Sequence, residues 1–95
     1  MKAMLLEKLR EAVAEWAQAH NIETALIDAK YSGIGPGVHI LVVARHGFEN
    51  WWWAERERDL FRFLRTKFNG NGDFVITRLE TMTEEEYEKY EDVDA

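Results

Sequence analysis

The sequence predicts a single α+β domain, in which a three-stranded mixed sheet has helices packed on one of its faces. Segments with helical periodicity and segments rich in β-branched residues follow one another in the order α-β-β-α-β-α. A chain of 95 residues has room for one core, and an apolar content of 46% is enough to form it. We expect one domain over residues 1–90 and a frayed acidic end over residues 91–95.

Residues 2–19 are predicted to form an amphipathic helix. Its apolar side chains recur at the spacing of one helical face: Leu5, Leu9, Ala12, Val13, Trp16 and Ala17. His20 and Asn21 follow, and Asn tolerates the left-handed conformation that often ends a helix.

Two strands are predicted to follow the first helix and to pair as a hairpin. Residues 23–31 largely alternate apolar and polar side chains, and residues 38–44 are apolar on both faces apart from His39. The segment 32–37 between them holds three glycines and the only proline, which is typical of a turn. A glycine-rich turn at residues 69–73 introduces a third predicted strand over residues 74–81.

Two further helices are predicted. The first covers residues 51–68, with Asn50 as its N-cap and a core face of Trp53, Leu60, Leu64 and Phe68. The spacing of Thr83 and Glu86 is that of a capping box, which predicts a short C-terminal helix.

Several classes of function are disfavoured by composition and motifs. The chain has no cysteine, which excludes a disulfide scaffold, a thiolate zinc site and a cysteine nucleophile. No nucleophile motif and no H-x-x-x-H pair is present, so we expect no enzyme and no cofactor; His39 is the one weak candidate for a metal ligand. The longest apolar run is only Ile40–Ala44 and the first residues are charged, so we expect a cytoplasmic protein with no membrane partner.

The net charge of −6 comes from the C-terminal end of the chain. Residues 84–95 hold seven acidic side chains and one lysine, which leaves residues 1–83 neutral with 11 basic and 11 acidic side chains. An acidic end repels phosphate groups, and this disfavours nucleic acid as the principal partner.

Three consecutive tryptophans are the most unusual feature of the sequence. On a helix they would span about 200° of the surface, so one face cannot bury all three. Trp53 is predicted to lie on the core face, Trp52 on an apolar flank and Trp51 on the charged face. Exposed aromatic side chains beside arginines are typical of interface hot spots.

Arginines follow the tryptophans along one face of the same predicted helix. Two interpretations stay open: a solvated face with ion pairs to Glu55 and Asp59, or a surface for a protein partner, including a second copy of the chain. The predicted partner surface consists of Trp51, Trp52, Arg58, Arg62 and Arg65. As an alternative, single-stranded or duplex nucleic acid would be bound by Arg45, Arg58, Arg62 and Arg65, with the aromatic rings stacking on bases.

Residues 48–64 resemble the signature F-x-G-x-x-x-x-x-R-H-R-x-x-x-x-x-L of BolA-like proteins, since Phe48 and Arg56 keep its spacing of eight. Residues 40–44 resemble the hydrophobic strand of that family, and residues 81–87 its closing T-x-T-P-x-E-W. The resemblance covers residues 38–88. It implies a fold similar to type II KH domains and a role as a glutaredoxin partner in iron–sulfur trafficking or as a transcriptional regulator.

This chain departs from the family pattern at the positions that matter for cluster binding. Glu57 and Val75 stand where the family has histidines, and Asn50 stands where it has glycine. Iron–sulfur trafficking is therefore the second alternative function, with His39 as the ligand that the chain offers.

Overall fold

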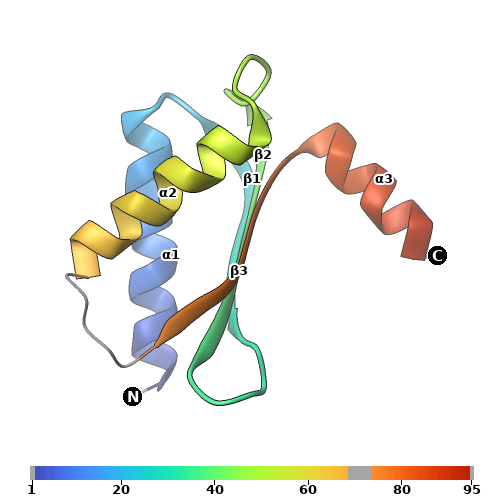
Figure 1. Ribbon diagram of the computed structural model, residues 1–95. Coiled ribbons are helices and arrows are strands. Elements are labelled where there is room, and N and C mark those ends of the chain that lie inside the picture. Colours follow the sequence, from blue (N-terminus) through green and yellow to red (C-terminus); the bar gives the residue numbers. More distant parts are fainter. Residues whose placement is uncertain (1, 69–73, 95) are drawn as a thin grey trace.

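The computed structural model describes the backbone of residues 2–68 and 74–94 (Figure 1). Its elements are α1 (Lys2–Ala19), β1 (Glu23–Tyr31), β2 (Gly37–His46), α2 (Trp53–Phe68), β3 (Val75–Thr83) and α3 (Glu84–Asp94). The predicted class and element order are confirmed. The turn expected at residues 69–73 lies outside the described residues, as does the last residue of the expected frayed end.

The sheet has the order β1-β2-β3 and is mixed. β1 and β2 are antiparallel and form the predicted hairpin, which closes when the Ser32 amide donates to the Gly37 carbonyl at 2.9 Å. β3 runs parallel to β2 and extends two residues beyond the prediction, because Met82 and Thr83 still pair with Val43 and Ala44.

The predicted end of the first helix is confirmed at Asn21. Its φ of 58° is left-handed, and the next amide, that of Ile22, donates to the Ala17 carbonyl at 2.8 Å. These contacts reverse the chain after α1 and direct it into β1.

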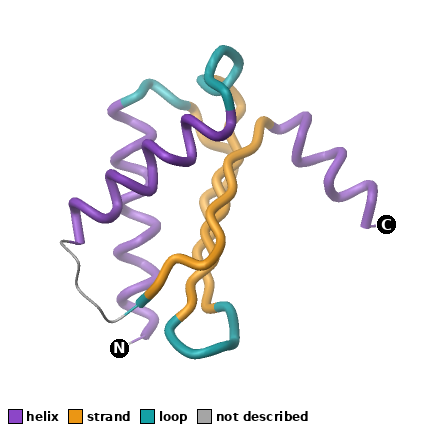
Figure 2. The backbone as a smooth tube through the Cα atoms, in the orientation of Figure 1, coloured by secondary structure: helices purple, strands orange, loops and turns teal. Residues whose placement is uncertain are grey.

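The core lies between one face of the sheet and the pair α1 and α2 (Figures 1 and 2). Alternate residues of β2 enter it, which is the period of a strand: Val38, Ile40, Val42 and Ala44. α3 leaves the end of β3 and projects from the sheet on the side away from α1 and α2 (Figure 1). Within residues 2–68 and 74–94, no helix combines the length and apolar character that a membrane span needs.

Candidate partner-binding surface

The surface around the tryptophans begins at a tight turn between β2 and α2. Gly47 has a φ of 116°, and a Cβ at this position would lie 2.9 Å from the Ile22 Cα. Only glycine meets both conditions without strain. The Trp51 amide then donates to the Phe48 carbonyl at 3.2 Å, and the Phe48 ring is buried, which anchors the turn in the core.

Arg56 ties this turn to the last strand. Arg56 is only 3% exposed, and its guanidinium carbon lies 4.4 Å from the centre of the Phe48 ring. It donates to the Trp51 carbonyl at 2.9 Å, to the Thr81 carbonyl at 2.9 Å and to the Thr81 hydroxyl at 2.7 Å. One side chain of α2 therefore fixes the turn before the helix and the edge of β3 at the same time.

Glu57 also binds the edge of β3 at Thr81. Its carboxylate accepts a hydrogen bond from the Thr81 amide at 2.9 Å and from the Thr81 hydroxyl at 3.2 Å. The outward amide and carbonyl of Thr81 are thus both occupied by side chains of α2. This arrangement blocks the pairing of a further strand at this point of the edge.

Glu86 joins α3 to the same network. Its carboxylate accepts from the Thr83 amide at 2.8 Å and lies 3.1 Å from Nη2 of Arg56, while its own amide donates to the Thr83 hydroxyl at 3.1 Å. The predicted capping box is confirmed. The hydrogen bond from the Thr83 amide, together with the charge of Arg56, lowers the pKa of Glu86 below its ordinary value of 4.5.

Trp51 is held on the opposite side of the turn, against α1. Its ring stacks on Trp16 at a centroid distance of 5.7 Å and lies 4.9 Å from the ring of His20. Asp59 fixes both partners: it accepts from Nε1 of Trp16 at 2.8 Å and lies 3.1 Å from Nε2 of His20. The predicted position of Trp51 on the charged face of α2 is wrong, because the helix begins two residues later.

The N-cap residue of α2 also differs from the prediction. The Trp52 carbonyl accepts from the amides of Glu55 and Arg56 at 3.0 and 3.1 Å, so Trp52 is the N-cap rather than Asn50. Trp53 is the first helical residue and lies on the projected core stripe, yet it is 54% exposed. Its prediction as a core residue is wrong because its ring borders the edge of β3 rather than the covered face of the sheet.

Trp52 and Trp53 form an exposed pair. Trp52 is 61% exposed, and the two ring centroids are 5.9 Å apart in an edge-to-face arrangement. Trp53 also borders an open groove of about 440 Å³ between the start of α2 and α3. The groove is further lined by Glu57, Thr81, Met82, Lys89 and Tyr90.

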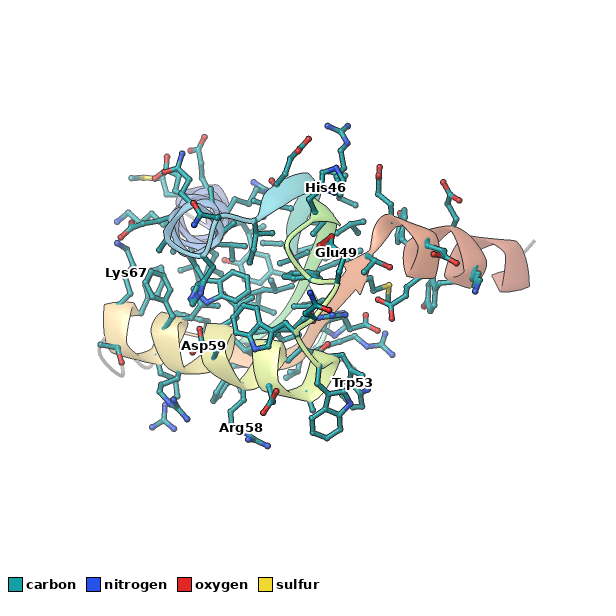
Figure 3. The ribbon with its side chains drawn as sticks, turned by 90° about the horizontal axis from the view of Figure 1, so that it is seen from above. His46, Glu49, Trp53, Arg58, Asp59 and Lys67 are labelled. Atoms are coloured by element: carbon teal, nitrogen blue, oxygen red, sulfur yellow. The ribbon has the colours of Figure 1, made fainter. Side chains whose placement is uncertain are left out.

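The arginines Arg58, Arg62 and Arg65 follow this pair along α2. Trp53 and Arg58 both project away from α1 (Figure 3). Among the described residues, no carboxylate lies within ion-pair distance of Arg58 or Arg62, because Asp59 points towards α1 instead. The Arg65 guanidinium lies 5.9 Å from the Phe61 ring. The expected ion pairs of a merely solvated face are therefore not formed by these two arginines.

Two other candidate residues lie elsewhere. Arg45 follows Ala44, which enters the core, so it projects on the other face of the sheet, where it lies 3.6 Å from both Glu23 and Glu84. It does not join the arginines of α2. His39 is half-buried on that same face, and the described residues contain no group of three His, Asp or Glu side chains able to hold a metal ion.

Arg56 and Asp59 are the residues that sequence reasoning missed. The spacing of Phe48 and Arg56 was a signal for the first, since it is part of the quoted family signature. No pattern pointed to the role of Asp59, whose partners, Trp16 in α1 and His20 directly after it, lie more than 35 residues away in the chain.

A comparison of the chain with models of protein families, with curated proteins and with solved structures finds no match. The resemblance to BolA-like proteins stays a prediction that rests on the residues quoted above.

Proposed function

We propose that this domain is a non-enzymatic binding module and that Trp52, Trp53 and Arg58, here called the tryptophan surface, contact a protein partner. One observation carries the proposal: two adjacent indoles are more than half exposed at a turn that buried side chains hold in place. Tryptophan and arginine are the residue types most enriched among interface hot spots.

The turn is organised before any partner arrives. Arg56 holds the Trp51 carbonyl, and the Trp51 ring is fixed by its stack on Trp16, so the backbone that precedes the pair is anchored on both sides. A surface that is already ordered loses little conformational entropy on binding. This favours a specific contact over nonspecific adhesion.

The exposed area of the pair is sufficient for useful affinity. A tryptophan side chain buries up to about 250 Å² in a core or an interface. With 61% and 54% of the two residues exposed, roughly 140 Å² of each is available, and covering it contributes about 3.5 kcal/mol per ring. That magnitude is typical of an interface hot spot.

The quoted resemblance also supports a protein partner, because BolA-like proteins act with glutaredoxins. The chain lacks the two histidines of that family, so the proposal includes no cluster ligand.

Nucleic acid is the second candidate, and the exposed arginines favour it. Arg58 and Arg62 form no ion pair among the described residues, and Trp52 offers a ring for stacking on a base. Against this, α3 is acidic and Arg45 projects on the other face of the sheet. Salt distinguishes the two candidates, because contacts to phosphates weaken steeply as the salt concentration rises.

The test uses the immobilised 95-residue protein as bait in a cell extract, followed by purification of the captured protein and calorimetric titration. We expect Trp52→Ala/Trp53→Ala to lose the captured protein, whereas Val75→Ala retains it. Val75 is the matched control because it is an equally exposed apolar residue outside the tryptophan surface. Equal affinity of the double variant and the parent would refute the proposal, and capture of nucleic acid alone would favour the second candidate.

A further inference from the structure

The face of the sheet opposite α1 and α2, here called the open face, has an ordered pattern of side chains. The strand register aligns them in three rows that cross the sheet. The rows are Leu26, Val43 and Met82, then Asp28, Leu41 and Glu80, and then Lys30, His39 and Arg78. The row nearest α3 is therefore apolar, the middle row has two acidic side chains on either side of a leucine, and the row nearest the hairpin turn is basic.

Intramolecular contacts leave this charge pattern largely unsatisfied. The ion pair between Arg78 and Glu80 has a distance of 3.8 Å, and the Arg78 side chain is 57% exposed, so it contributes little to stability. Among the described residues, no acidic side chain forms an ion pair with Lys30, and no basic side chain forms one with Asp28. The two charged rows are available to a partner.

The two ends of the open face are apolar. A groove of about 260 Å³ runs along the open face, and at one end it is lined by Tyr87 and Tyr90 of α3 together with Leu26 and Met82. At the other end lies the hairpin turn, where Ile34 is 83% exposed. α3 projects away from the sheet and leaves the lower part of the open face uncovered (Figures 1 and 2).

We propose that the open face is the interface of a homodimer, in which two copies pack face to face with their strands antiparallel. A closed dimer has a twofold axis, and for two facing sheets this axis lies in the plane of the interface. A twofold axis parallel to the strands would place each charged row opposite the same row of the second copy. Like charges would then face each other and repel. An axis across the strands reverses the row order and places Asp28 and Glu80 of one copy opposite Lys30 and Arg78 of the other.

The same axis also matches the apolar ends. Successive rows are two residues, or about 6.6 Å, apart along the strands. With the axis between the acidic and basic rows, the hairpin turn of one copy extends to the α3 end of the other. Ile34 is thereby brought to the end of the groove beside Tyr87 and Tyr90, so that the exposed apolar residue and the apolar side chains at this end cover each other.

The sheet face alone is too small for a stable interface, so the two apolar ends must also belong to it. Three strands about 4.8 Å apart and about 30 Å long give the sheet face on the order of 400 Å². A stable interface covers about 800 Å² of each partner. The hairpin turn and α3 must supply the remainder, and both extend beyond the sheet (Figure 1).

A charge-swap experiment tests this arrangement. Sedimentation velocity and native mass spectrometry would measure the mass of the parent, of Lys30→Glu/Arg78→Glu and of Asp28→Lys/Glu80→Lys. We expect a dimeric parent and two monomeric variants, because each variant has a face of a single charge sign. Mixing the two variants restores a dimer that contains one copy of each. Circular dichroism verifies that both variants are folded.

The matched control is Arg62→Glu/Arg65→Glu, which changes the net charge by the same amount as the first variant but lies on α2, outside the tryptophan surface. We expect it to remain dimeric. A monomeric parent at millimolar concentration would overturn the proposal. So would a dimer that persists in both open-face variants, a mixture that stays monomeric, or a dimer broken only by the control. None of these outcomes depends on the tryptophan surface, so the two proposals stand or fall separately.

Discussion

Arg56→Met is expected to destabilise the domain by about 3 kcal/mol. The change removes the donors for the buried carbonyl of Thr81 and the partly buried carbonyl of Trp51, and each buried acceptor left without a donor costs about 1–3 kcal/mol. The substitution also removes the free-energy cost of burying a charged guanidinium, and this offsets part of the loss. For a domain of this size, the result corresponds to a decrease in Tm of roughly 12–24 °C.

Urea and thermal unfolding followed by far-UV circular dichroism would measure this loss. Arg58→Met is the matched control, since it makes the same substitution on the exposed side of α2 and is expected to change the free energy of unfolding by less than about 0.5 kcal/mol. Arg56→Lys should be intermediate, because an ammonium keeps the charge but lacks the planar fork that reaches both carbonyls. If Arg56→Met and Arg58→Met were equally stable, the assigned role of Arg56 would be refuted.

Two further predictions concern Gly47 and Glu86. Gly47→Ala is expected to lower the free energy of unfolding, measured by chemical denaturation, by about 2–4 kcal/mol, because residue 47 has a left-handed φ and its new Cβ would press against Ile22. Gly33→Ala is the control, since Gly33 has a similar φ but open space around it. An equal loss at Gly33 would contradict this reasoning. The pKa of Glu86 is lowered in the folded state, so its contribution to stability is complete above the unfolded pKa near 4.5 and is lost as the pH falls through the folded pKa. Glu86→Gln should flatten the decrease in Tm between about pH 5 and pH 3, and an unchanged acid profile would exclude this role.

The fold was predictable because its elements carry strong local patterns. α1 and β1 have the bounds that the periodicity indicated, and the box formed by Thr83 and Glu86 starts α3 as its spacing required. In each case the residues that decide the element lie within a few positions of one another. Local chemistry is therefore sufficient to place them.

The tryptophan surface was only partly predictable. The sequence singled out Trp52 and Arg58 but exchanged the roles of Trp51 and Trp53, because periodicity assumes that the helix has already begun. The actual start depends on distant contacts, namely the Trp16 ring that takes up Trp51 and the edge of β3 that Arg56 reaches. Such contacts join residues far apart in the chain, so no spacing in the sequence reveals them.

In the proposed function, Trp52 and Trp53 supply most of the affinity for a protein partner. The most direct measurement is the Kd of the captured, purified partner for the parent and for Trp52→Ala/Trp53→Ala, at low and high salt. We predict a loss of at least about 100-fold in the double variant, which corresponds to about 2.7 kcal/mol, and only a weak dependence on salt. An affinity within threefold of the parent would contradict the claim.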